Sequence, residues 1–232
     1  MRYPVRFVLR KLHSLSGVVP VGVFLAVHLW TNATALGGQA GYDRAVAEIQ
    51  ALPGLALIEL FGIALPIAYH AVFGVILTLS SRPNVVRYPY SGNWMYVMQR
   101  ATGVLALAFI ALHVWEYRGA KLVGTMGVES FYPALAANLS STQLGFPWTA
   151  AGYVLGIGAC ALHFSTGLWG FCFSWGLLGS ARARRTAATV FAVVGLAVFS
   201  AGAATTFHFA TGVGAQPPCD VLDSSSRAPR AR

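Results

Sequence analysis

Hydrophobic residues are gathered along the chain into five long, continuous runs that polar segments separate. A bilayer core is about 30 Å thick, and a helix needs about 20 apolar residues to cross it. The runs lack the short alternation of apolar and polar positions that barrel strands show. The pattern predicts an all-α integral membrane protein with five transmembrane helices in a single membrane domain, about residues 1–210. The expected helices span about residues 15–36, 55–80, 94–117, 148–178 and 186–210.

The polar segments predict how these helices are connected. The first connection, GGQAGYDRAVAEIQALPG, has room for a short interfacial helix that Pro53 and Gly54 would end. The longest connection, residues 118–147, mixes polar and apolar residues, and we expect it to lie along the outer surface. The last segment, residues 211–232, is rich in Pro, Ser and Arg, which predicts a disordered tail.

Composition and charge add an orientation in the membrane. Of the 232 residues, 56% are hydrophobic and 10% are charged, and the mean hydropathy is +0.61, far from a soluble domain. The net charge of +9 arises largely from basic residues that flank the runs on one side, which the positive-inside rule makes cytoplasmic. We therefore expect a multi-pass protein of a bacterial-type inner membrane, surrounded by lipid, with a cytoplasmic N-terminus, an outside C-terminus and no nucleic-acid partner. The basic residues on this side are Arg2, Arg6, Arg10, Lys11, Arg82, Arg87, Arg100, Arg182, Arg184 and Arg185.

The N-terminus also has features of a secretory signal peptide. Basic residues, an apolar run and Ala33-Thr34-Ala35 follow one another as they do around a cleavage site. The apolar run is long for a signal peptide and contains His28. We therefore interpret this segment as the first transmembrane helix.

Each of the first four runs contains one histidine, namely His28, His70, His113 and His163, whereas His208, near the end of the fifth run, lacks a partner at its depth. A histidine in a lipid-spanning helix costs free energy unless its ring nitrogens find partners. In an up-down bundle of the first four helices, the first and third helices run in the same direction, so His28 and His113 lie at comparable depth in the outer half. His70 lies in the cytoplasmic half, and His163, near the middle of a long run, is its natural partner.

Two facing histidines can bind one haem b between them, and two such haems would carry electrons across the bilayer. The chain contains no C-x-x-C-H, so covalent haem attachment is not indicated. A single membrane histidine can also be a packing residue or part of a proton path. Zinc requires its ligands to converge within about 2 Å of one ion, whereas the expected depths separate the two pairs. Small residues on the face of His163 would admit a porphyrin or allow close helix packing: Gly152, Gly156, Cys160, Gly167 and Gly170.

Further polar residues near the helix ends are candidates for contacts with haem propionates or a quinone. On the cytoplasmic side these are Arg10, Lys11, His13 and Arg100. On the outer side, Glu59 precedes His70 by about three helical turns and so shares its face. Glu59 could exchange a proton with a quinone, or could be an interfacial carboxylate that faces water.

Four stretches, each with one of the four histidines, together resemble the cytochrome b membrane anchor of succinate:quinone oxidoreductases, in its five-helix class with two haems. The resemblance implies that His28 and His113 bind a haem b near the outer face, and that His70 and His163 bind one near the cytoplasm. It also implies a flavoprotein subunit that oxidises succinate or reduces fumarate, an iron-sulfur subunit, and a membrane quinone, usually menaquinone. The stretches are RKLHSLSGVVPVGVFLAVHLW, LPIAYHAVFG, NWMYVMQRATGVLALAFIALHVWE and ALHFSTGLWGFCFSWG, within about residues 9–180.

No G-x-G-x-x-G motif opens a strand-to-helix unit, so the dehydrogenase reaction is expected on a partner subunit, and no catalytic residue is assigned here. Two alternatives stay open at this point. One is a dihaem b subunit of another respiratory enzyme, such as a hydrogenase or a formate dehydrogenase. The other is a haem-free transporter or channel that uses the histidines as a proton relay.

Overall fold

The structure of the chain, a computed structural model, describes residues 3–127, 129 and 131–212. Most of the predicted tail, residues 213–232, lies outside the described residues. All regular elements of the described part are helices, and five helical spans are long and apolar enough to cross a membrane. The prediction of an all-α membrane protein with five spans is therefore confirmed. The spans are Pro4–Gly37, Leu55–Leu79, Ser91–Leu122, Trp148–Ser174 and Ala181–Thr211.

The first span is divided into two helices near Pro20. Helix α1 covers Tyr3–Val18 and α2 covers Pro20–Ala33, and a 3-10 turn, η1 (Thr34–Gly37), follows. Proline lacks a backbone N–H and is tolerated in the first turn of a helix, which is its place in α2. The span begins well before residue 15, because the basic residues that precede the apolar run also favour a helix.

The second and third spans each contain a π-helical segment. The second consists of α4 (Leu55–Leu57), the π-helix η2 (Ile58–Ala64) and α5 (Leu65–Leu79). The third consists of α6 (Ser91–Val114), the π-helix η3 (Trp115–Gly119) and α7 (Ala120–Leu122). Such segments are rare and often occur at functional sites. Both spans are therefore irregular at one end.

Helix α9 (Trp148–Ser174) is the centre of the helix packing, with α6 and α10 (Ala181–Thr211) against it. The Ser180 hydroxyl accepts a hydrogen bond from the N–H of Ala183 at 3.1 Å, and this N-cap starts α10 before the predicted residue 186. Small residues bring the two helices together, because a Cβ on Gly202 would lie 2.7 Å from the Ile157 side chain.

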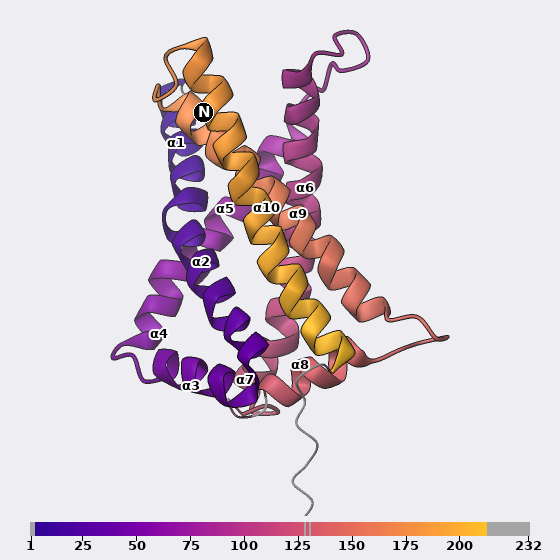
Figure 1. Cartoon of the computed structure of the whole chain (residues 1–232). Helices are drawn as coiled ribbons and strands as arrows, with labels where there is room; N and C mark the ends of the chain where they lie inside the picture. The colour runs from indigo at the N-terminus through magenta and orange to yellow at the C-terminus, as the bar shows by residue number, and fades with distance from the viewer. Residues whose placement is uncertain (1–2, 128, 130, 213–232) are drawn as a thin grey trace, which may run out of the picture.

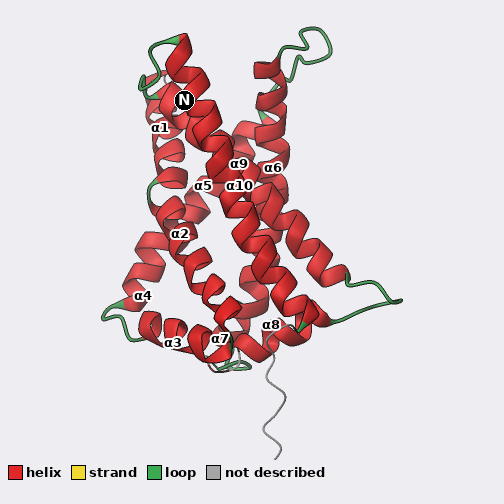
Figure 2. Ribbon diagram, viewed as in Figure 1, coloured by secondary structure: helices red, strands yellow, loops and turns green. Residues whose placement is uncertain are grey.

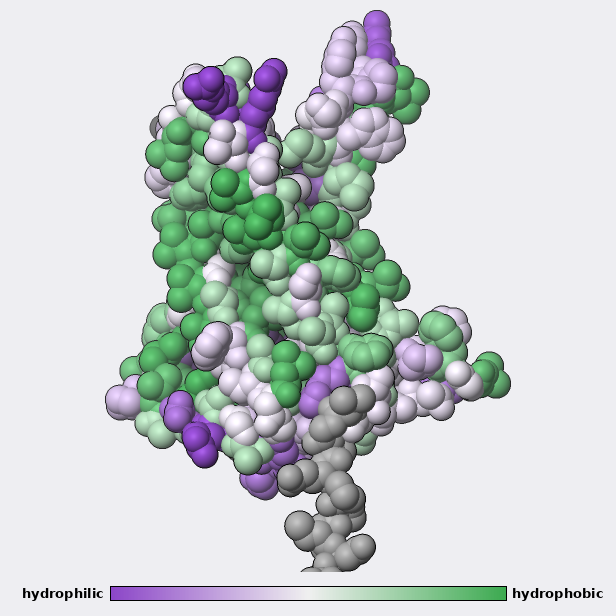
Figure 3. Space-filling view, in the orientation of Figure 1, coloured by the Kyte–Doolittle hydropathy of each residue, from purple (hydrophilic) through white to green (hydrophobic). Residues whose placement is uncertain are grey.

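The five spans form a bundle with two different ends (Figure 1). The N-terminus and the connections 81–90 and 175–180 lie at one end, called the basic end after its arginines. The other, called the far end, is covered by α3 (Gln39–Gln50) and α8 (Phe131–Ser140), with α7 beside them. Helix α3 lies where the sequence predicts an interfacial helix, whereas α8 was not predicted. Figure 2 shows the longer loops at the two ends, and Figure 3 shows an apolar belt between the ends.

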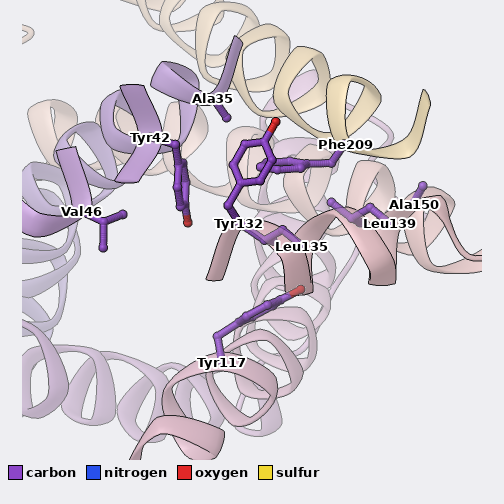
Figure 4. Packing of buried hydrophobic residues seen from close by; sticks show 9 residues of the cluster. All are labelled: Ala35, Tyr42, Val46, Tyr117, Tyr132, Leu135, Leu139, Ala150 and Phe209. Atoms are coloured by element: carbon purple, nitrogen blue, oxygen red, sulfur yellow. The ribbon is translucent and has the colours of Figure 1, made fainter. Parts of the chain in front are cut away.

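A cluster of buried apolar residues lies at the far end of the bundle (Figure 4). The Tyr42 ring on α3 lies 5.6 Å from the Tyr132 ring on α8 and 6.2 Å from the Phe209 ring on α10. Burial, with smaller contributions from Tyr117 and Asp43, raises the pKa of Tyr42 to about 12, so its phenol stays neutral. This cluster fixes α3 and α8 against the bundle. Its members are Ala35, Tyr42, Val46, Tyr117, Tyr132, Leu135, Leu139, Ala150 and Phe209.

Candidate functional site

His28, His70, His113 and His163 lie in two pairs, in the combination that helix direction predicts. His70 on α5 faces His163 on α9, with ring centroids 6.0 Å apart and ring planes at 84°. His28 on α2 faces His113 on α6, with centroids 5.7 Å apart and planes at 79°. Each pair joins alternate spans, the second and fourth or the first and third.

The two pairs lie toward opposite ends of the bundle. The His70 ring stacks on His13 of α1 at a centroid distance of 4.0 Å, on the side of the basic end. The His113 ring lies 5.3 Å from the ring of Tyr117, a member of the far-end cluster. We call His70 and His163 the basic-end pair, and His28 and His113 the far-end pair.

Both rings of the basic-end pair are held by a backbone carbonyl of a neighbouring helix. Nδ1 of His70 lies 2.9 Å from the carbonyl oxygen of His13, and Nδ1 of His163 lies 3.0 Å from that of Gln99. A carbonyl oxygen only accepts, so each Nδ1 must carry the ring proton and donate it. Nε2 of each neutral ring then has a free lone pair, which is the arrangement that metal-binding histidines adopt.

A glycine makes room for each of these rings. Gly17 and Gly103 each come four residues after the accepting carbonyl, so glycine and carbonyl share a helix face. A Cβ on Gly103 would lie 2.8 Å from Cε1 of His163, and a Cβ on Gly17 would overlap the His70 ring. Helices α1 and α6 therefore each have a notch, the space that a glycine leaves open. Gly17 on α1 leaves it for the His70 ring, and Gly103 on α6 leaves it for the His163 ring. The sequence interpretation missed this use because it considered the small residues on the helix of His163 itself and not a glycine on a neighbouring helix.

Both histidines of the basic-end pair line a cavity of about 160 Å³. Gln99, Arg100 and His13 also line it. Within the described part of the chain, Nδ1 of His13 and Nε of Arg100 are buried without a hydrogen-bond partner. Nη1 of Arg100 donates a hydrogen bond to the carbonyl of Tyr96 at 3.0 Å, and the guanidinium lies over the Tyr96 ring. The cavity wall therefore has nitrogen groups available for a polar ligand.

The other candidates for propionate or quinone contacts lie elsewhere. Lys11 donates a hydrogen bond to the carbonyl of Ser174, and Arg10 is exposed. Glu59 lies in the π-helix η2 and forms an ion pair with Arg118 of η3 at 2.5 Å. Of the five predicted residues, His13 and Arg100 thus line the cavity.

The far-end pair is embedded in side-chain hydrogen bonds. Nδ1 of His113 lies 3.3 Å from the hydroxyl of Tyr153, which donates to Oε2 of Glu116 at 2.8 Å. The amide of Asn138 on α8 donates to the other oxygen of Glu116 at 2.5 Å. Nε2 of His28 has one long contact, 3.4 Å from the amide nitrogen of Asn32. The sequence interpretation missed Glu116, although its place three residues after His113 puts both on one helix face.

The ring separations fit one metal ion between the members of each pair. A metal–imidazole bond is about 2 Å long and the ring centre lies roughly 1 Å farther back, so two axial imidazoles have centroids about 6 Å apart. The observed values of 6.0 Å and 5.7 Å agree with this distance. No three or more His, Cys, Asp or Glu side chains of the described residues converge on one metal position, as zinc would need. Two axial imidazoles suit an iron whose remaining ligands belong to a porphyrin.

Comparison with known proteins identifies the family. No protein-family model matches the chain. Over 204 residues the chain is 38% identical to the succinate dehydrogenase cytochrome b558 subunit of Bacillus subtilis (strain 168). The match covers 88% of this chain and 96% of that subunit. The chain belongs to the cytochrome b anchor family of succinate:quinone oxidoreductases. The family predicted from the four histidine-containing stretches is therefore confirmed.

The similarity extends over nearly the whole cytochrome b anchor and is not confined to one span. It covers more of the chain than the four histidine-containing stretches together.

Proposed function

We propose that this cytochrome b anchor binds two haem b groups, one between the basic-end pair and one between the far-end pair. The main support is the separation of the two imidazoles in each pair, 6.0 Å and 5.7 Å. The Nδ1 contacts of His70 and His163 add support, since they leave Nε2 free to bind iron. Bound haem b supplies one-electron transfer, and two axial imidazoles leave no open position for oxygen.

His13 and Arg100 are the residues of this chain best placed to bind a polar group in the basic-end cavity. Their buried nitrogens lack partners among the described residues, and both side chains line the cavity. Arg100 would donate a charge-assisted hydrogen bond to a haem propionate or to a quinone oxygen. His13 would bind the same polar group through its Nδ1 while its ring packs on His70.

The chain would serve as the membrane anchor and electron carrier of a larger enzyme. The relative's name, a succinate dehydrogenase subunit, supports association with a flavoprotein subunit and an iron-sulfur subunit. The chain would pass electrons between the iron-sulfur subunit and membrane quinone, which we take to be menaquinone. The basic end, with Arg182, Arg184 and Arg185 in the first turns of α10, would face the cytoplasm and dock these subunits.

Haem content is the first test of this proposal. The complex purified in mild detergent should contain two protohaems per anchor by the pyridine haemochrome assay, with low-spin b-type bands on reduction. A folded complex without haem would contradict the proposal. The histidines would then be interpreted as packing residues or as a proton relay. One protohaem per anchor would contradict the assignment of two sites.

A further inference from the structure

We propose that Tyr153 and Glu116 are positioning residues for His113, and that they lower the redox potential of the iron that His113 binds. The inference rests on the proposed haem ligation by the far-end pair. It assigns a role to a carboxylate and a phenol that lie outside the basic-end cavity. Their contacts connect three elements, α9, η3 and α6.

The direction of the hydrogen bonds among His113, Tyr153 and Glu116 is set by Glu116, which is their final acceptor. A carboxylate only accepts, so the Tyr153 hydroxyl donates its single proton to Oε2 of Glu116 at 2.8 Å. The phenol oxygen is then the acceptor for His113, whose Nδ1 lies 3.3 Å away. Nδ1 of His113 therefore carries the ring proton, and its Nε2 is free for iron.

Glu116 is held in place by neutral groups. Asn138 on α8 donates to Oε1 of Glu116 at 2.5 Å, and its amide nitrogen also lies 3.3 Å from the Tyr117 hydroxyl. The nearest arginine in the sequence, Arg118, is in an ion pair with Glu59 at 2.5 Å. The hydrogen bonds described for Glu116 come from Tyr153 and Asn138, so no cation compensates its charge through these bonds.

The basic-end pair provides an internal comparison. There, Nδ1 of His70 and of His163 donates to neutral backbone carbonyls, and the cationic Arg100 lines the same cavity. At the far end, Nδ1 of His113 donates to the phenol oxygen of Tyr153, and the Tyr153 hydroxyl donates in turn to the carboxylate of Glu116. A negative group behind an axial imidazole makes it a stronger donor and stabilises ferric over ferrous iron. The effect should therefore be confined to the far-end haem.

The test uses the intact complex with Tyr153→Phe, Glu116→Gln and both together. Redox titration followed by absorption, with electron paramagnetic resonance of the ferric haems, reports each haem separately. Each single variant should raise the ferrous-to-ferric ratio of the far-end haem about tenfold at fixed ambient potential, an upward shift of about 59 mV for one electron. The double variant should shift it no further, because both residues act through one chain of hydrogen bonds.

Tyr132→Phe is the matched control. Tyr132 also lies at the far end, but its hydroxyl is 3.3 Å from Nε2 of His208 and is not part of the Glu116 network. This variant should leave both potentials unchanged. Loss of the far-end haem alone from Tyr153→Phe, with Glu116→Gln keeping it at a raised potential, would equally support the inference.

Two results would overturn it. One is two haems with wild-type potentials and resonance signals in both single variants. The other is an equal shift of both haems, in the variants and in Tyr132→Phe alike. Either result leaves the proposed function intact, whereas a wild-type complex without haem contradicts the proposed function as well.

Discussion

His163 shows at the scale of single residues how much of the site depends on its neighbours. Its position in an apolar run marks it as a candidate ligand, but its orientation comes from α6. The Gln99 carbonyl accepts from its Nδ1 at 3.0 Å, and Gly103 leaves room for its ring. The same combination of carbonyl and glycine on α1 holds His70.

The pairing predicts which substitutions affect the same haem. His70→Ala and His163→Ala should each abolish one and the same b-type signal in the resonance spectrum and leave the other, because each removes one axial ligand of one iron. His208→Ala should keep both signals, since His208 contacts Tyr132 and lies in neither pair. Loss of different signals from the two alanine variants would contradict the pairing.

Gly103→Ala should disturb the basic-end haem without removing a ligand. The added Cβ would lie 2.8 Å from Cε1 and 3.1 Å from Nδ1 of His163, so the ring must move away from the Gln99 carbonyl. We expect about tenfold weaker retention of this haem, measured by haem content after detergent washing. The control is Gly158→Ala on α9, where a Cβ would meet the Phe199 ring at 3.6 Å, an ordinary contact. Equal haem retention in the two variants would show that the notch at Gly103 has no such role.

At the scale of elements, the long helices are joined by small residues rather than by a large apolar interface. Helices α9 and α10 approach closely where Gly195 lies against Ser165 and Gly202 against Ile157. Lipid tails are as apolar as leucine side chains, so packing of small residues is an important source of helix association within the membrane. The aromatic cluster at the far end adds the burial that the spans lack.

Gly195→Val should destabilise the α9–α10 contact. A Cβ at this position would lie 2.8 Å from Cβ of Ser165, and valine adds two further methyl groups. Overpacking of this kind costs about 1–3 kcal/mol. Thermal unfolding in detergent, followed by circular dichroism, should show a lower Tm than wild type. Leu196→Val is the control, because the Leu196 side chain is 64% exposed on the same helix, and an equal loss of Tm in both variants would contradict this account.

At the scale of the whole molecule, the bundle is asymmetric. Arginines gather at the basic end, whereas α3 and α8 with their tyrosines cover the far end. The two histidine pairs lie at different depths between these ends. With the two haems proposed above, this arrangement would connect a soluble partner at one face of the membrane with the opposite half of the bilayer.

The orientation can be tested with two exposed loop positions. Val86, in the basic-end connection, is 98% exposed, and Leu144, before α9 at the far end, is fully exposed. In a Cys219→Ser background, a membrane-impermeant thiol reagent added to intact cells should label Leu144→Cys and not Val86→Cys. The positive-inside rule is the physical reason, since arginine-rich connections stay in the cytoplasm. The reverse labelling pattern would place the basic end outside.

The sequence by itself determined the five spans, the four histidines and their combination into pairs. Bilayer thickness requires long apolar runs, and successive crossings alternate in direction, so these features are visible in linear order. Only the tertiary structure decided which oxygen accepts the hydrogen bond from each Nδ1 and which glycines make room for the rings. It also decided that Glu116 is linked to His113 through the Tyr153 hydroxyl. His113 and Tyr153 are 40 residues apart, and Tyr153 reaches Glu116 from another helix. Such contacts follow from how the helices rotate and approach one another, which no local pattern of apolar residues specifies.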